Sequence, residues 1–126
     1  MGTNMAVRTL FRYHSNGQKE YEGWLYNELL HRVDGPAYTS WYDNGQPEQF
    51  LWYIEEQYHR ADGPAVQVLF RDGRILEEKW WVNGKAVKDY ELEEYKKWLT
   101  RFNLLGKKYI LWTDEEKVLW KLSCIF

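Results

Sequence analysis

The chain has 126 residues and a formal net charge of −2, with acidic and basic residues mixed along its length. One domain is therefore expected, and the charge pattern of a DNA-binding or membrane-surface protein is excluded. Cys124 is the single cysteine, which excludes an intrachain disulfide framework and favours a reducing compartment. No apolar run is long enough to cross a membrane, so the sequence predicts a cytoplasmic protein.

An internal repeat organises most of the chain. Residues 1–7 precede it and are expected to form a flexible terminus. The segment Asn16–Pro36 recurs 28 residues later as Asn44–Pro64, and a third copy in the same register follows Asp72. A repeat of this length is typical of stacked structural units, because one unit cannot bury its aromatic face alone.

Each copy is predicted to contain a β-hairpin. Asn-Gly at 16–17 and 44–45, and Asp-Gly at 72–73, predict tight turns in which both residues tolerate positive φ. Stretches rich in aromatic and branched residues flank these turns and predict strands. The second strand of each hairpin is expected to span nine residues, at Gln18–Tyr26, Gln46–Ile54 and Arg74–Val82.

Two further features recur with the repeat. Asp-Gly-Pro-Ala closes the first two copies at Asp34–Ala37 and Asp62–Ala65. We expect Asp to close an Asx-turn, Gly to supply a positive φ and Pro to start the next strand. A tryptophan occupies one equivalent position in all copies, at Trp24, Trp52 and Trp80. We interpret this ladder as the internal core of the repeat, with stacking platforms for bases or sugars as the alternative.

Helical patterns replace the repeat after Val87. Asp89 is a suitable N-cap for an amphipathic helix over Tyr90–Asn103, and Lys107–Trp112 has the composition of a short strand. Thr113–Glu116 has the capping-box spacing that starts a second helix. The apolar face of that helix comprises Val118, Leu119, Leu122, Ile125 and Phe126. We expect the two helices to cover the exposed sheet edge of the last repeat.

These patterns together predict a mainly β fold with a C-terminal α part. The expected architecture is a single-layer antiparallel meander of β-hairpin repeats, with a period of 28 residues, capped by two helices. Residues 8–88 form the repeat sheet, and residues 89–126 form a helical cap within the same domain.

One cluster of residues has catalytic character, and it is copied with the repeat. A His base oriented by Asp, with Arg binding phosphate, would fit a metal-independent phosphodiesterase that uses His31 or His59. Residues copied at the repeat period are more often structural, and we favour satisfied turn groups or an Arg stacked on a neighbouring Trp. The members of the cluster are His31, Arg32 and Asp34 in one copy, and His59, Arg60 and Asp62 in the next.

The sequence predicts no metal and no cofactor. The three His residues and Cys124 lack the short ligand spacing of a zinc site. The Gly residues sit singly in turns, so no phosphate-binding loop is present. Acidic residues outnumber basic ones in the repeat section, which argues against a groove for single-stranded nucleic acid.

Several motifs resemble those of the variant MORN-repeat proteins. They are Trp-Tyr-x-Asn-Gly (Trp41–Gly45), Trp-Trp-Val-Asn-Gly (Trp80–Gly84) and His-Arg-x-Asp-Gly-Pro-Ala (His31–Ala37, His59–Ala65). The resemblance covers about Arg8 to Lys88, while the helical C-terminal third departs from it. Similar proteins occur in large DNA viruses, phages and bacteria, and some bacterial members are described as antitoxins. The resemblance implies an open meander of antiparallel hairpins with a scaffolding or binding role, and it carries over no catalytic residue.

We therefore predict a non-enzymatic repeat module that binds another protein. By resemblance it would be a viral or phage effector that acts on a host protein in the host cytoplasm, or an antitoxin-like partner. The alternatives are a small-ligand-binding protein that sequesters a nucleotide, and the phosphodiesterase.

We expect the contact surface on the aromatic sheet face, with the C-terminal helices as the second candidate. Neither DNA binding nor membrane insertion is expected. The uncapped edge at Thr9–His14 could pair with a second copy of the chain. The expected binding residues are His31, Arg32, Trp41, Tyr42, Trp52, Tyr53, His59, Arg60, Trp80 and Trp81.

Overall fold

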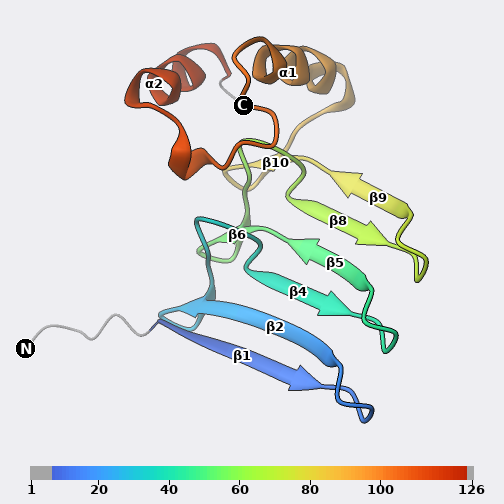
Figure 1. The fold of residues 1–126 in the computed structure, drawn as a ribbon. Helices are drawn as coiled ribbons and strands as arrows, with labels where there is room; N and C mark the ends of the chain where they lie inside the picture. The colour runs from blue at the N-terminus through green and yellow to red at the C-terminus, as the bar shows by residue number, and fades with distance from the viewer. Residues whose placement is uncertain (1–6, 125–126) are drawn as a thin grey trace, which may run out of the picture.

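The protein is a stack of three β-hairpin tiers with two helices at one end (Figure 1). This computed structural model describes residues 7–124. The prediction of a mainly β fold with antiparallel hairpins and C-terminal helices is confirmed. Of the terminus expected at residues 1–7, residues 1–6 lie outside the described part, and Val7 already begins a strand. Ile125 and Phe126, expected on the apolar face of the second helix, also lie outside it.

One larger sheet carries the long hairpin of each tier. Its strand order is β1-β2-β4-β5-β8-β9, and β3 also pairs with β2. Every neighbouring pair is antiparallel. Tight turns join the two strands of each long hairpin, and a short hairpin lies between one long hairpin and the next. The strands on this path are β1 (Val7–Tyr13), β2 (Lys19–Tyr26), β4 (Tyr38–Trp41), β5 (Pro47–Leu51), β8 (Val66–Leu69) and β9 (Ile75–Lys79).

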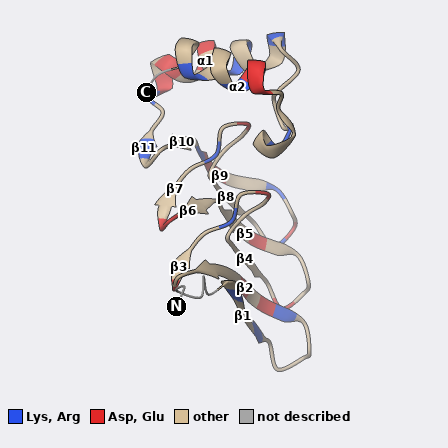
Figure 2. Cartoon of the chain, turned by 90° about the vertical axis from the view of Figure 1, so that its left-hand side faces the viewer, with Lys and Arg blue, Asp and Glu red and all other residues tan. Residues whose placement is uncertain are grey.

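A shorter hairpin follows in each tier and lies to one side of the larger sheet (Figure 2). In the first tier the end of β2 continues into it, whereas the second and third tiers use separate two-stranded sheets. The strands are β3 (Leu29–Leu30), β6 (Tyr53–Ile54), β7 (Gln57–Tyr58), β10 (Trp81–Val82) and β11 (Lys85–Ala86).

A tryptophan stands where the chain passes from the long hairpin to the short one. The Trp52 N–H donates to the Ala65 carbonyl at 2.8 Å, and the Trp52 carbonyl accepts from the His59 N–H at 3.1 Å. The backbone therefore changes hydrogen-bond partner at this residue. The expected nine-residue strand is wrong in two tiers, since Trp52 separates β5 from β6 and Trp80 separates β9 from β10. Trp24 has main-chain partners equivalent to those of Trp52, but β2 runs through it because β1 pairs with β2 as far as Tyr26. The pairing of β4 with β5 ends at Leu51, and that of β8 with β9 ends at Lys79.

The Asn-Gly turns differ from expectation, because only the glycine has a positive φ. Gly17 has φ 88°, and Asn16 stays outside the positive region. Asn16 Oδ1 instead accepts the N–H of Gln18 at 3.0 Å. The Asn16 amide also donates to the Asp43 carbonyl of the next tier at 2.7 Å. The register of β1 against β2 shifts beside this turn, as a hairpin with a glycine bulge requires.

The turns of the short hairpins are the ones in which two consecutive residues have positive φ. Glu55 and Glu56 have φ 47° and 63°, and their backbone is held there by the tier below. The Glu56 N–H donates to the Leu30 carbonyl at 2.8 Å. The equivalent pairs are Asn27-Glu28 in the first tier and Asn83-Gly84 in the third.

The cap begins with helix α1. Lys88 occupies the N-cap position without a side-chain bond, so the expectation of Asp89 as N-cap is wrong by one residue. Asp89 instead opens the first turn, where its charge complements the helix dipole. The cap elements are α1 (Asp89–Arg101), the 3₁₀ helix η1 (Tyr109–Leu111) and α2 (Asp114–Ser123).

The second half of the cap has one expected and one unexpected element. The capping box of α2 is present, with Thr113 Oγ1 accepting the Glu116 N–H at 3.1 Å and Glu116 Oε1 accepting the Thr113 N–H at 2.8 Å. The short strand proposed for Lys107–Trp112 is wrong. The Trp112 N–H donates to the Tyr109 carbonyl, which closes a 3₁₀ turn with no strand partner.

The main hydrophobic core lies between the cap and the third tier. Leu99 and Leu104 are fully buried, and Trp80 and Val82 reach them from the repeat. Thr39 and Ser40 are buried within the repeat itself. The larger core residues come from the cap and the third tier: Trp80, Val82, Val87, Tyr95, Leu99, Leu104, Trp112 and Trp120.

The helices do not cover the β9 edge, so that expectation is wrong. All five residues of β9 are exposed. The cap packs instead on Trp80, Val82 and Val87, which flank or belong to the short hairpin of the third tier. These side chains bury apolar area against the cap, which stabilises the fold. Strand β9 carries charged residues, and burying them would give little or no free energy.

Candidate functional site

The first copied His-Arg-Asp cluster forms an arginine clamp, by which we mean an Arg held between a Trp ring and its own turn. The Arg32 guanidinium carbon lies 4.0 Å from the ring centroid of Trp24. Arg32 Nε donates to Asp34 at 2.8 Å, and Nη1 donates to the Pro36 carbonyl at 3.4 Å. The hydrogen bond from Arg32 is the main cause of a lowered Asp34 pKa. The clamp thus couples a cation–π contact to the geometry of the turn.

The second clamp repeats these contacts in a more enclosed place. The Arg60 guanidinium carbon lies 4.1 Å from the Trp52 centroid. Nε and Nη2 of Arg60 both donate to the Asp62 carboxylate at 3.3 Å, and Nη1 donates to the Pro64 carbonyl at 3.2 Å. The Asp62 side chain is 2% exposed, whereas the Asp34 side chain is 48% exposed.

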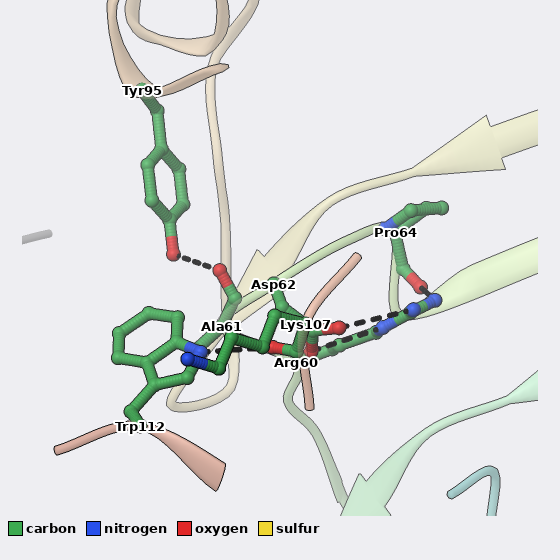
Figure 3. A network of polar contacts seen from close by, with 7 residues as sticks. All are labelled: Arg60, Ala61, Asp62, Pro64, Tyr95, Lys107 and Trp112. Carbon is green, nitrogen blue, oxygen red and sulfur yellow. Dashed lines mark hydrogen bonds and ion pairs between the residues drawn. The ribbon is translucent and has the colours of Figure 1, made fainter. Parts of the chain in front are cut away.

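The cap encloses the second clamp by binding its main chain (Figure 3). The Tyr95 hydroxyl donates to the Ala61 carbonyl, and the Gly106 N–H donates to the Asp62 carbonyl at 2.8 Å. The Trp120 indole N–H donates to the Tyr95 hydroxyl at 2.9 Å. Burial raises the pKa of Tyr95 above its ordinary value. The cap is therefore positioned by hydrogen bonds to one particular turn of the repeat.

The glycine of each Asp-Gly-Pro turn makes room for the guanidinium. A Cβ on Gly63 would lie 2.7 Å from Arg60 Cζ, and one on Gly35 would lie 3.0 Å from Arg32 Cζ. Neither glycine has a positive φ, so the expected backbone reason for glycine is wrong. Glycine is needed at these positions because the Arg side chain approaches too closely to leave room for a Cβ atom.

The two histidines connect each tier to the next. His31 Nδ1 accepts the Glu55 N–H at 3.1 Å, and His59 Nδ1 accepts the Asn83 N–H at 2.9 Å. An accepting Nδ1 fixes the neutral tautomer with its proton on Nε2. Burial lowers the pKa of His59, and the charge of Asp62 opposes this shift. Neither ring is hydrogen-bonded to the Asp of its own cluster, so the oriented His-Asp pair of a general base is not assembled.

The third tier has no clamp, and its tryptophan has different surroundings. Trp80 is 6% exposed and meets the Tyr95 ring edge-on at 5.6 Å. Lys96 Nζ lies 5.8 Å from its centroid. The ladder therefore consists of two tryptophans under a guanidinium, Trp24 and Trp52, and one in the core beneath the cap.

A cavity of about 480 Å³ lies between the second tier and the cap, and we call it the cap cavity. It brings together four of the expected binding residues: Arg32, Trp52, His59 and Arg60. The cap side of the cavity is formed by Tyr109, Ile110 and Lys117, which the sequence interpretation missed. No local pattern places η1 and α2 against the second tier, so only the tertiary contacts reveal these residues.

A second hollow of about 330 Å³ contains Trp41 and Tyr42. The Tyr42 hydroxyl donates to the Leu69 carbonyl at 2.7 Å, and the Arg71 guanidinium carbon lies 5.2 Å from the Tyr42 centroid. The side chains of Tyr42 and Arg71 therefore connect the second tier to the third.

The remaining expected residues lie in neither hollow. Tyr53 stacks on Tyr58 at 4.6 Å, and Tyr58 meets the Trp81 ring at 5.4 Å. These contacts run from one short hairpin to the next. His31 packs against Tyr26 at 5.2 Å. The ten expected residues are therefore spread over several places and do not form one site.

Strand β1 forms an open edge of the larger sheet. All seven of its residues are exposed, and within residues 7–124 it pairs with β2 alone. Phe11 and Tyr13 are each 54% exposed, and their rings meet edge-to-face at 5.8 Å. An edge of this kind combines unpaired backbone groups with apolar side chains.

In the part of the chain that the structure describes, no group of three His, Cys, Asp or Glu residues is placed to hold a metal ion. None of the helices described is long and apolar enough to cross a membrane. A scan against protein-family models finds no match, and searches of curated proteins and of solved structures find no similar chain.

Proposed function

We propose that the protein is a non-enzymatic module that binds another protein, and that it does so by adding an extended segment of that partner to the edge of β1. The observation that carries this proposal is the exposure of the whole strand, on both faces and along one edge. Edge pairing of this kind is a recurrent mode of peptide recognition, in which main-chain hydrogen bonds supply affinity and side-chain contacts supply specificity.

The register of the sheet identifies the backbone groups that face outward. The Trp24 N–H donates to the Ala37 carbonyl in the next tier, so the backbone groups of Trp24 point away from β1. Thr9 is paired with Trp24, and its own N–H and C=O therefore point to the open edge. Phe11, two residues further on, has the same orientation.

The exposed side chains favour a partner segment with apolar or aromatic residues at alternate positions. Phe11 and Tyr13 lie on one face of β1 and are available to such side chains. Arg8 is engaged with Glu28 at 2.6 Å, and Arg12 with Glu20 at 3.2 Å, so both cations already have partners. Ion pairs with a partner are therefore expected to contribute less to binding at β1 than aromatic contacts do.

The resemblance to variant MORN-repeat proteins supports a binding role, and from it we also propose the biological setting. That setting is a viral or phage effector acting on a protein of the host cytoplasm, or an antitoxin-like partner. The same edge would also accept β1 of a second copy, which makes a homo-oligomer the expected form in the absence of a partner.

The test uses peptides selected for binding from a random displayed library. We expect the selected peptides to slow amide hydrogen exchange at Thr9 and Phe11, because their outward N–H groups would become hydrogen-bonded. Thr9→Pro removes one of these donors without touching the β1–β2 pairs, and we expect it to weaken binding by about tenfold or more.

Thr9→Val is the matched control, since it keeps the N–H group and the strand preference. Thermal unfolding of both variants establishes that the fold is kept. Equal peptide affinity of Thr9→Pro and Thr9→Val would contradict the proposal, as would protection confined to amides of the cap.

A further inference from the structure

The cap cavity is bounded by two different parts of the chain. Trp52 and Ile54 come from the second tier, and Tyr109 and Ile110 come from the 3₁₀ turn of the cap. Its volume of about 480 Å³ lies within the range of small-molecule pockets, which is roughly 300–1,000 Å³. Aromatic and aliphatic walls of this kind suit a flat ring system.

The ionisable residues of the cavity include one cation, Lys117, that has no ion-pair partner among the described residues. Arg60 and Asp62 neutralise each other inside the second clamp. Lys117 Nζ lies 5.1 Å from the Tyr109 centroid, and no carboxylate in residues 7–124 is within ion-pair distance of it. Arg32 uses Nε and Nη1 in its own clamp, which leaves Nη2 without a hydrogen-bond partner among the described residues. Because Arg32 is paired with Asp34, it offers a free N–H donor and no unpaired charge. Within the described residues, Lys117 and Glu55 are the lining residues whose charges remain unpaired.

His59 adds a neutral donor to these cations. Its Nδ1 accepts the Asn83 N–H, so the proton of the neutral ring lies on Nε2. No hydrogen bond from Nε2 is present within the described residues, although His59 lines the cavity. An acceptor on a ligand would satisfy this donor.

We propose that the cap cavity binds one small planar aromatic anion. Its ring system packs against Trp52 and Tyr109, and its anionic group meets Lys117 and Arg32. Aryl carboxylates and nucleoside monophosphates share this chemistry. The site lies apart from β1 and does not depend on the protein-binding function proposed above.

Two fluorescent probes with related ring systems test the charge requirement. 1-Anilinonaphthalene-8-sulfonate is an aromatic anion, and N-phenyl-1-naphthylamine carries the same rings without the sulfonate. We expect the sulfonate to bind with a stoichiometry of one and at least about tenfold more tightly than the uncharged probe. Equal affinities of the two probes would overturn the proposal.

Variants locate the binding. Lys117→Gln should weaken sulfonate binding by about tenfold and leave the uncharged probe unchanged. Lys121→Gln is the matched control, because it removes one charge from the exposed side of the same helix, outside the cavity. Ile110→Trp should fill the cavity mouth and weaken both probes. Near-ultraviolet circular dichroism checks that each variant keeps its tertiary packing. Unchanged sulfonate binding in Lys117→Gln or Ile110→Trp would overturn the assignment of the site.

Competition separates the two sources of such a ligand. Displacement of the bound sulfonate probe by adenosine monophosphate supports a nucleotide, and displacement by indole-3-carboxylate supports an aryl acid. Displacement by neither compound would overturn the proposed ligand class.

Discussion

The two arginine clamps use the same residue types, yet their carboxylates differ sharply in exposure. Asp34 lies at the surface, whereas the cap leaves Asp62 almost no contact with water. An exposed ion pair is screened and adds little to stability. A buried ion pair has a larger effect on stability when it is broken, because removing one partner leaves the other charge buried and unpaired. The same substitution should therefore have different consequences in the two tiers.

We expect Asp62→Asn to lower the free energy of unfolding by about 3 kcal/mol, because it leaves Arg60 as an uncompensated cation. Asp34→Asn is the matched control and should cost less than about 1 kcal/mol. Urea denaturation of both variants measures the difference. Equal losses would show that the cap does not enclose the second clamp as described.

The buried histidine predicts a loss of stability in acid. Burial lowers the pKa of His59 in the folded protein below its ordinary value, so the unfolded chain binds the proton more readily. Stability contributed by neutral His59 is then complete above the unfolded pKa and is lost as the pH falls through the folded pKa. Protonation would also remove the acceptor that holds the Asn83 N–H.

We therefore expect the unfolding free energy of the parent to fall between pH 7.5 and pH 5 by more than that of His59→Gln. An NMR titration of the His59 ring protons measures the pKa directly. A ring that titrates at or above the ordinary histidine value would contradict this explanation.

At the scale of single elements, the short-hairpin turns place two consecutive residues in the left-handed region. This conformation costs an L-residue with a Cβ about 1–2 kcal/mol, and Asn and Gly tolerate it best. The third tier has Asn83-Gly84 at these positions, whereas the second tier has Glu55-Glu56. The backbone N–H groups of both glutamates are held by the first tier, since Glu55 donates to the His31 ring and Glu56 donates to the Leu30 carbonyl.

Replacing Glu55-Glu56 by Asn-Gly should therefore stabilise the fold by about 1 kcal/mol, because both contacts to the first tier come from the backbone and are kept. Differential scanning calorimetry should show a higher Tm. The reverse change, Asn83-Gly84 to Glu-Glu, should lower the Tm. A lower Tm for the Asn-Gly variant would contradict the strain argument.

The elements themselves were largely predictable, because their signals are local. The 28-residue register and the turn residues gave the long hairpins, and the capping box at Thr113 gave α2. The interruptions at Trp52 and Trp80 were not predictable in the same way. A strand continues through the tryptophan where its hairpin partner pairs beyond it, as β1 does with β2, and the extent of that pairing cannot be read from the repeat pattern.

For the molecule as a whole, the placement of the cap depends on contacts that no repeat pattern contains. The Tyr95 hydroxyl and the Gly106 N–H reach the second clamp from 34 or more residues along the chain. The repeat motif points to Arg32, Trp52, His59 and Arg60, but no sequence pattern assigns Lys117 to the same cavity. The cap side of that cavity belongs to a segment whose position is fixed only by tertiary packing.

The main-chain bonds between tiers are the same at both junctions, and this makes the number of tiers adjustable. The Arg32 N–H donates to the Tyr53 carbonyl, and the Arg60 N–H donates to the Trp81 carbonyl. The donor and the acceptor of the second bond each lie 28 residues after those of the first. Duplicating residues 37–64 would add one tier that can form the same main-chain hydrogen bonds with the tiers on both sides of it. The open strand β1 at one end and the helical cap at the other would each keep their form, and only their separation would grow. Gene duplication can thus change the distance between the two ends of this architecture without changing either end.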